Sequence, residues 1–360
     1  MTEAARQSIT AEKNGAGVAT NEALWPAPAD AQAERTPWLW LALLTALAAV
    51  LRGIALNQQL WYDEITTLLD FVRTPMAQIL TTYTSQNQHM LYSVLARVAV
   101  VTLGEAAWTL RLPAAVFGVL AVPTLYFCAR LLTTRREALL GCALLTVSYH
   151  HVWFSQNARG YTGLAFFTLV STYFFIRGAR ENKDDGRATA RPYGNWVWYA
   201  VALALGMYTH LTMGFVAAGH GITYLWLLGA RQWEMGRLPR HAWSPMLGFV
   251  LAGVITAALY APVAGDLVQR TLGEKVKPGA VKESTRAEWK NPLWLVAETA
   301  RGLGAGSAAA GFAAMSLGGL IVLAGLWSYW KQNRYIVGLM VAPALVTAAA
   351  LLAVGHNLWP

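Results

Sequence analysis

The segment TLRLPAAVFGVLAVPTLYFCARLL, residues 109–132, holds an almost uninterrupted apolar run between Arg111 and Arg130. A helix needs roughly 20 such residues to cross the hydrocarbon core of a bilayer. This segment therefore predicts a membrane-spanning helix with a cation near each end. Further candidate spans, found by the same criterion, lie at 37–56, 137–155, 160–177, 195–211, 213–229, 245–263, 309–329 and 335–355.

The composition agrees with a membrane protein. Of the 360 residues, 56% are hydrophobic and only 13% are charged, whereas soluble domains carry about 25% charged residues. The 16 Trp residues fit membrane interfaces, where this residue is enriched. We predict an all-α polytopic membrane protein of about nine spans. Residues 1–36 read as a disordered cytosolic tail without a signal peptide, and residues 37–360 as the membrane domain.

The distribution of Lys and Arg predicts the topology. The net charge of +9 comes from cations in loops between apolar runs, which indicates a positive-inside bias and not nucleic-acid binding. With the N-terminus inside, segments 130–137, 177–192, 231–241 and 331–334 are cytosolic. Segment 89–103 is short and contains Arg97, so we expect a helix lying at the interface.

Residues 57–108 then form a long first external loop that carries interfacial helices. A second external loop, 264–290, is basic, and could bind anionic lipid headgroups or a phosphate-bearing substrate, or simply be solvated.

Two adjacent acids, Asp63 and Glu64, follow the first span closely in a chain that is otherwise poor in acids. A carboxylate near apolar surface is costly unless it is paired or takes part in a reaction. As a general base it could accept the proton of an attacking hydroxyl. Cations such as Arg111, Arg159 and those of the 264–290 loop could stabilise a leaving group. Histidines also collect on the predicted external side: His89, His150, His151, His210 and His356.

Four segments resemble one known family. They are WYDE (61–64), the quoted 109–132 segment, YHHVWFSQNARGYTGLAFFTLVSTYFF (149–175) and MYTHLTMGF (207–215). Together they resemble bacterial GT-C superfamily glycosyltransferases related to protein O-mannosyltransferases and aminoarabinose transferases (families 39 and 83). The resemblance covers roughly residues 38–260. It implies a GT-C-like helix bundle in the bacterial inner membrane, with the active site on the extracytoplasmic side.

The resemblance also implies a reaction and roles for individual residues. A sugar would pass from a polyprenyl-phosphate donor to an acceptor hydroxyl of a lipid, glycan or protein, with inversion. The first acid of the motif, Asp63, would be the general base, and Glu64 would shape the site. The family's remaining matched positions, expected to bind the donor phosphate or substrate, are His89, Arg111, Arg159, Tyr161 and His210. We expect the prenyl chain in a groove between spans and the 89–103 helix.

The sequence departs from the family in places. HMLYS (89–93) lacks two prolines that are frequent in the family, and Gly160 stands where a bulkier residue is common. Relatives continue beyond the position of residue 360, so the chain could be C-terminally truncated. No ligand spacing requires a metal; a divalent ion remains possible but is not indicated.

Alternatives stay open at this point. The protein could be a transporter or flippase of a lipid-linked sugar, which would place ionisable residues within spans, or a non-catalytic scaffold. Arg159 could anchor phospholipid phosphate, and Arg111 could reach the interface from a helix end. Glu64 could be a solvated loop acid and His210 an interfacial residue.

Overall fold

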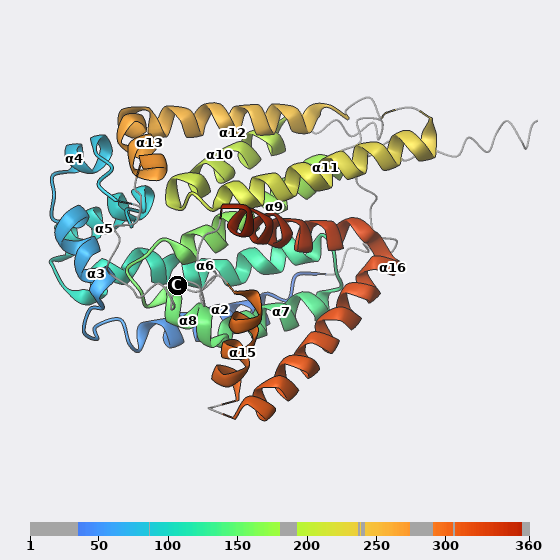
Figure 1. Cartoon of the computed structure of the whole chain (residues 1–360), viewed down its shortest axis with the longest axis horizontal. Helices are drawn as coiled ribbons and strands as arrows, with labels where there is room; N and C mark the ends of the chain where they lie inside the picture. Colours follow the sequence, from blue (N-terminus) through green and yellow to red (C-terminus); the bar gives the residue numbers. More distant parts are fainter. Residues whose placement is uncertain are drawn as a thin grey trace, which may run out of the picture.

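The computed structural model describes residues 35–85, 87–180, 193–236, 238, 242–273, 291–304 and 307–354. Every regular element within these ranges is a helix (Figure 1), which confirms the predicted all-α fold class. Several predictions concern residues outside these ranges: the tail up to residue 34, the 177–192 loop beyond Arg180, the basic loop beyond Gly273, and His356.

The first part of the chain forms short helices between two longer ones. These elements are α2 (Trp38–Gly53), α3 (Tyr62–Thr66), the π-helical turn η1 (Thr67–Val72), α4 (Met76–Thr81), α5 (Met90–Leu103) and α6 (Ala107–Arg130). The middle comprises α7 (Arg135–Val147), α8 (Tyr149–Ser155), α9 (Tyr161–Arg180), α10 (Gly194–Thr209), α11 (Met213–Met235) and α12 (Ser244–Tyr260). The last elements are η2 (Ala261–Val263), α13 (Ala264–Gly273), α15 (Pro292–Leu303) and α16 (Ala308–Val354).

All the predicted spans are helical, but the count of nine is not confirmed. Among the described residues, 5 helices are long and apolar enough to cross a membrane: Ala107–Arg130, Tyr161–Arg180, Met213–Glu234, Ser244–Arg270 and Ala309–Ala353. The predicted 137–155 span is divided because Ser148 leaves helical geometry and its side chain accepts a hydrogen bond from His151 N, which starts α8. The last two predicted spans, 309–329 and 335–355, are the two helical segments of α16, which meet at a kink at Asn333.

Helix α6 lies at the centre of the first half of the bundle. It packs against α2, α5, α7, α8 and α9. A second core forms where α9, α10 and α12 meet around the fully buried Trp196. Gly178 permits this contact, because a Cβ there would lie 2.7 Å from the Trp196 ring. Close helix packing through small residues is typical of membrane bundles.

The predicted long first loop folds back onto α6. One face of helix α5, which includes Tyr92 and Ala96, is buried against the bundle. The Tyr92 hydroxyl donates a hydrogen bond to the Leu110 carbonyl over 2.6 Å. Val72 of η1 and Leu110 belong to the same buried cluster. The helices expected within this loop are therefore present, and they are packed against the bundle.

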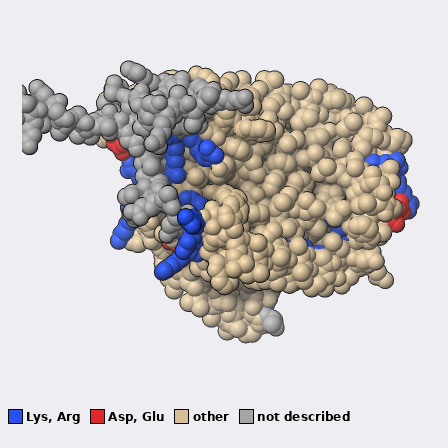
Figure 2. Space-filling model, turned by 180° about the vertical axis from the view of Figure 1, so that it is seen from behind, with Lys and Arg blue, Asp and Glu red and all other residues tan. Residues whose placement is uncertain are grey.

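Cations gather at the end of the bundle opposite this loop, as Figure 2 illustrates for one face. Arg130 ends α6, Arg135 begins α7, Arg177 and Arg180 lie in the last turn of α9, and Arg231 is near the end of α11. These ends correspond to the segments predicted to be cytosolic. The topology prediction rests on this group of cations.

Candidate active site

A buried ion pair fixes the acid motif to the bundle. The side chain of Glu64 is completely buried, and that of Arg111 is 2% exposed. Arg111 Nε donates to Glu64 Oε1 over 2.7 Å, and Nη2 donates to Oε2 over 2.6 Å. The Ala158 N–H donates to Oε1 over 2.6 Å and the Trp61 N–H to Oε2 over 2.9 Å. Glu64 thus joins the first loop, α6 and the α8–α9 connection.

The guanidinium of Arg111 is also fully engaged. Besides Glu64, its Nη1 donates to the carbonyls of Leu56 and Gln58, and its Nη2 to that of Gln59, each over 2.9 Å. A guanidinium has five N–H donors, and all are used within the chain. In this geometry none is left for a donor phosphate, contrary to the role expected for Arg111 from the sequence. Glu64 likewise is not the solvated loop acid of the alternative interpretation.

Asp63 differs completely from its neighbour. It lies in the first turn of α3 and is exposed. No hydrogen bond or ion pair engages its carboxylate within the described part of the chain. Adjacent acids on a helix point in different directions, so burial of Glu64 turns Asp63 outward. Its oxygens are therefore available to a proton donor outside the protein.

The other four predicted site residues form one cluster, which we call the polar cluster: His89, Arg159, Tyr161 and His210. The His89 ring centroid lies 4.7 Å from that of His210 and 5.6 Å from that of Tyr161. The Tyr161 and His210 centroids are 5.5 Å apart, and the Arg159 guanidinium lies 5.7 Å from the Tyr161 ring centroid. These residues come from three separate segments of the sequence, around positions 89, 160 and 210, and the fold brings them together.

Hydrogen bonds define which ring nitrogens of the two histidines carry the proton. His89 Nδ1 lies 3.2 Å from the Thr209 carbonyl oxygen, which can only accept, so Nδ1 is the donor. His210 Nδ1 accepts from the Thr212 N–H over 3.2 Å. In the neutral state, His89 Nε2 is therefore an acceptor and His210 Nε2 a donor. The His89 Nε2 atom is buried without a partner.

Both rings are held neutral. Burial lowers the pKa of His89 well below its ordinary value, and the positive charge of Arg159, and of His210 when it is protonated, lowers it further. Burial and the charge of Arg159 lower the pKa of His210 to about 4. Desolvation disfavours the imidazolium form. The guanidinium of Arg159 is consequently the positive charge of the cluster at neutral pH.

Arg159 is held from one side only. It is 6% exposed, and its Nη2 donates to Asn87 Oδ1 over 2.9 Å. Its Nε is buried and has no hydrogen-bond partner. An unpaired buried donor on a charged group is costly. The residue therefore fits an anion bound beside it.

Gly160 explains one departure from the family pattern. A Cβ at this position would lie 2.9 Å from the Thr209 carbonyl oxygen and 3.2 Å from His89 Cβ. A bulkier residue would push the start of α9 away from Thr209 and His89. The glycine thus permits the close approach that forms the polar cluster.

The polar cluster borders an apolar pocket of about 590 Å³. Tyr161 belongs to both the cluster and the pocket wall. The other lining residues are Leu125, Leu145, His151, Leu164, Ala165, Thr168, Leu169, Thr212, Phe215, Val216 and Thr347. This wall comes from α6 to α9, α11 and α16, and not from α5. The pocket therefore does not lie beside the 89–103 helix, where the sequence interpretation expected the prenyl groove.

Sequence reasoning missed Arg52, beside the apolar pocket, and Asn87, beside the polar cluster, and gave His151 no individual role. Arg52 is completely buried; it donates to the Thr146 and Leu145 carbonyls over 3.2 Å and to His151 Nδ1 over 2.8 Å. A cation inside the apolar 37–56 segment was the available signal for Arg52. Asn87 carried no comparable signal, because its role depends on the fold of the first loop.

Besides Arg52, a histidine lies buried in a predicted span, where a transporter would require an ionisable residue. His220 of α11 is 1% exposed. Its Nδ1 lies 3.3 Å from the Tyr199 hydroxyl and its Nε2 3.1 Å from the Thr172 hydroxyl. Both nitrogens have partners, which favours a structural role in joining α9, α10 and α11.

No group of three or more His, Cys, Asp and Glu side chains suited to a metal ion occurs among the residues that the structure describes. Within the described ranges, the cation of the polar cluster is Arg159.

Fold and site together define a class of membrane protein: a helix bundle with a polar, partly cationic cluster at one end that opens onto an apolar pocket. Residues 89–264 match the family model described as dolichyl-phosphate-mannose-protein mannosyltransferase. Over these residues, just under half of the chain, the match agrees with the resemblance to protein O-mannosyltransferases. It includes the polar cluster and Arg111 but begins after Asp63 and Glu64.

Two solved structures are similar at low identity. The S. cerevisiae protein O-mannosyltransferase Pmt1-Pmt2 complex bound to the sugar donor is 19% identical, with a TM-score of 0.48, over 67% of this chain and 34% of that chain. ArnT from Cupriavidus metallidurans bound to undecaprenyl phosphate is 16% identical, with a TM-score of 0.48, over 89% and 60%. This chain thus spans about a third and three fifths of their lengths. Comparison with curated proteins gives no match.

Proposed function

We propose that this protein is a membrane glycosyltransferase that moves a sugar from a polyprenyl-phosphate donor to an acceptor hydroxyl, with inversion. One observation carries the proposal: a cluster with a buried guanidinium whose Nε has no hydrogen-bond partner shares Tyr161 with an apolar pocket. A polyprenyl-phosphate sugar has the matching parts, an anionic head and a long apolar chain. The two similar structures are bound to a sugar donor and to undecaprenyl phosphate, respectively.

In this proposal the donor phosphate lies against Arg159 and His210. The Nε–H of Arg159 and the Nε2–H of His210 donate to phosphate oxygens, and the apolar chain enters the pocket past Tyr161. His89 Nε2 accepts a hydrogen bond from a sugar hydroxyl. Cations and fixed donors at the leaving group stabilise the charge that develops there. Membrane lipid surrounds the bundle, and nucleic acid plays no part.

Asp63 serves as the general base. The acceptor hydroxyl loses its proton to the Asp63 carboxylate, and its oxygen attacks the anomeric carbon from the face opposite the phosphate. The new C–O bond forms as the bond from the anomeric carbon to the phosphate oxygen breaks. Polyprenyl phosphate leaves, and the configuration at the anomeric carbon is inverted. The buried pair Glu64–Arg111 has a positioning role, which we call the strut role: it holds α3 against the bundle and so keeps Asp63 near the polar cluster.

The proposed side of the membrane follows from the charges. The end that carries Arg130, Arg135 and Arg231 is assigned to the cytosol by the positive-inside rule. The polar cluster then faces the extracytoplasmic side. For a bacterial chain this membrane is the inner membrane, and the donor is available in its outer leaflet.

The test is sugar transfer in membranes from a panel of polyprenyl-phosphate sugars to endogenous acceptors, with and without a chelator. Asp63→Asn is compared with Asp70→Asn, a second exposed acid of the same loop. Loss of a general base lowers the rate by about 10²- to 10⁴-fold. We expect that loss in Asp63→Asn and full activity in Asp70→Asn. Equal activity in both variants would remove Asp63 as the base, and transfer that fails only with the chelator would add a metal to the mechanism.

A further inference from the structure

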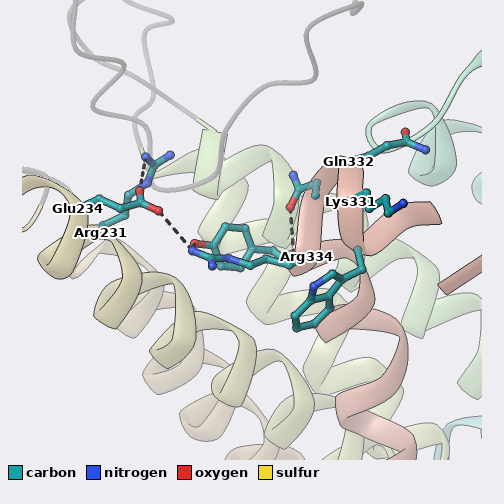
Figure 3. Close-up of a pocket in the computed structure, with 8 residues that line it drawn as sticks. Arg231, Glu234, Lys331, Gln332 and Arg334 are labelled. Atoms are coloured by element: carbon teal, nitrogen blue, oxygen red, sulfur yellow. Dashed lines mark hydrogen bonds and ion pairs between the residues drawn. The ribbon is translucent and has the colours of Figure 1, made fainter. Parts of the chain in front are cut away.

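A second pocket lies at the basic end of the bundle, where α11 ends and α16 bends (Figure 3). Its volume is about 420 Å³, and it is separate from the polar cluster and its apolar pocket. Its lining residues are Arg231, Glu234, Trp330, Lys331, Gln332, Asn333, Arg334 and Tyr335. Three cations and one carboxylate give the lining a formal charge of +2.

The bend in α16 creates this pocket. Asn333 leaves helical geometry at φ −160° and ψ 100°, and its Oδ1 accepts from the Tyr335 N–H over 3.0 Å, which starts the second half of the helix. Tyr335 and Ile336 are buried in the core shared with α11. The bend therefore leaves Lys331 and Arg334 beside the end of α11, where the chain would otherwise continue as a straight helix.

The carboxylate in the pocket holds its cations weakly. Glu234 Oε2 lies 3.4 Å from Arg231 Nη1, and Oε1 lies 3.3 Å from Arg334 Nη2. The Glu234 and Arg334 side chains are 45% and 44% exposed. An exposed pair such as Glu234 with Arg334 contributes little to stability. Lys331 and Arg334 therefore present positive charge that a stronger anion can use.

Aromatic residues surround the cations as they do at a membrane interface. The ring centroid of Trp226 lies 5.8 Å from that of Trp330 and 5.2 Å from that of Tyr335. Lys331 Nζ lies 5.0 Å from the Trp327 ring centroid. Trp and Tyr are enriched at headgroup level. Exposed apolar side chains continue along α16 on either side of the bend, including Leu323 and Met340. A ligand here would meet cations at its head and an apolar helix surface below it.

We propose that this pocket binds the phosphate of an anionic phospholipid headgroup in the leaflet on the basic side. Phosphate oxygens accept from Lys331 and Arg334, and the acyl chains lie along the exposed apolar surface of α16. Basic pockets between membrane helices are suited to anionic headgroups. The lipid would connect α11 to α16, and so stabilise the half of α16 that supplies Thr347 to the apolar pocket. This inference does not depend on the proposed transferase function.

The experiment measures lipid binding to the purified full chain in detergent. Dioleoylphosphatidylglycerol and cardiolipin are titrated in mixed micelles, with dioleoylphosphatidylcholine as the uncharged control and inorganic phosphate as the soluble control. Binding is read by native mass spectrometry and by the rise in unfolding temperature. The variants are the double substitution Lys331→Gln/Arg334→Gln, Glu234→Gln, and Arg136→Gln, an exposed cation at the same end.

The anionic lipids are expected to bind and to raise the unfolding temperature, and phosphatidylcholine is not. The double substitution should weaken binding about 20- to 30-fold, at about fivefold for each cation near an anionic surface. Glu234→Gln should strengthen binding, because the competing carboxylate is lost, and Arg136→Gln should leave it unchanged. The opposite signs distinguish a binding role from loss of folding.

Equal affinity of wild type and the double variant for phosphatidylglycerol would overturn the proposal. So would equal affinity for phosphatidylcholine, since the phosphate charge would then be irrelevant. A rise in unfolding temperature with inorganic phosphate as large as that with lipid would show that a free phosphate, and not a headgroup, is the ligand.

Discussion

Removal of the Glu64 carboxylate is expected to destabilise the protein strongly, although this acid belongs to a predicted catalytic motif. The side chain is fully buried and accepts four hydrogen bonds, two from Arg111 and one each from Ala158 N–H and Trp61 N–H. In Glu64→Ala the Arg111 guanidinium stays buried without a counter-charge. Breaking a buried pair in this way costs about 3–5 kcal/mol.

A double-mutant cycle can separate the interaction energy between Glu64 and Arg111 from the cost of each single substitution. Arg111→Met removes the cation and leaves Glu64 buried and unpaired, so its cost is also about 3–5 kcal/mol. The double variant contains neither buried charge, and its cost should fall short of the sum by a coupling energy of up to about 3 kcal/mol. Four carbonyl groups of residues 55–59 lose Arg111 as donor, so the double variant remains less stable than wild type.

The assay is reversible unfolding in mixed micelles of dodecyl maltoside and sodium dodecyl sulfate, followed by far-ultraviolet circular dichroism. The matched control is the pair Arg73 and Glu105, which has the same 2.6 Å separation but side chains 52% and 43% exposed. Arg73→Met and Glu105→Gln should show no measurable change. If Glu64→Ala were as mild as these controls, or if the cycle showed no coupling, burial would not be the source of the energy and the strut role would be wrong.

Three further predictions concern the polar cluster and the apolar pocket. Gly160→Ala places a methyl group 2.9 Å from the Thr209 carbonyl oxygen. It should lower the free energy of unfolding by about 1–3 kcal/mol and lower transfer activity. Unchanged unfolding and activity would show that the close contact of Gly160 with Thr209 is not required. Leu164→Trp places a larger side chain in the apolar pocket. In a transfer assay at matched expression it should raise KM for donors with a long prenyl chain more than for donors with a short one. An equal effect on both would place the prenyl chain outside this pocket. Because burial lowers the pKa of His210 to about 4, the unfolded chain binds the extra proton first as pH falls. Stability should therefore decrease from about pH 6.5 to about pH 4, by about 1.4 kcal/mol per pH unit for this residue, and His210→Gln should remove that part of the slope in unfolding measured against pH.

Much of the site could be predicted because its residues stand at the ends of apolar segments. Asp63 and Glu64 lie just outside a predicted span and Arg111 near the end of one, and a charge in such a position needs a partner or a role. The same reasoning does not predict what each of these residues does in the folded protein. Sequence placed Glu64 and Arg111 with the reacting groups, whereas the structure pairs them with each other and with backbone groups.

The sequence alone determined the helical membrane fold, because backbone N–H and C=O groups in lipid must form hydrogen bonds within each apolar segment. The lengths of these segments can be read directly from the sequence. It also determined which end of the bundle is basic. Only the tertiary structure decided which of two adjacent acids is buried, where the apolar pocket opens, and that Asn333 bends α16 into a second pocket. These features depend on contacts between residues far apart in the chain, such as Glu64 with Ala158 and Gly160 with Thr209, and the local pattern of a sequence does not contain them.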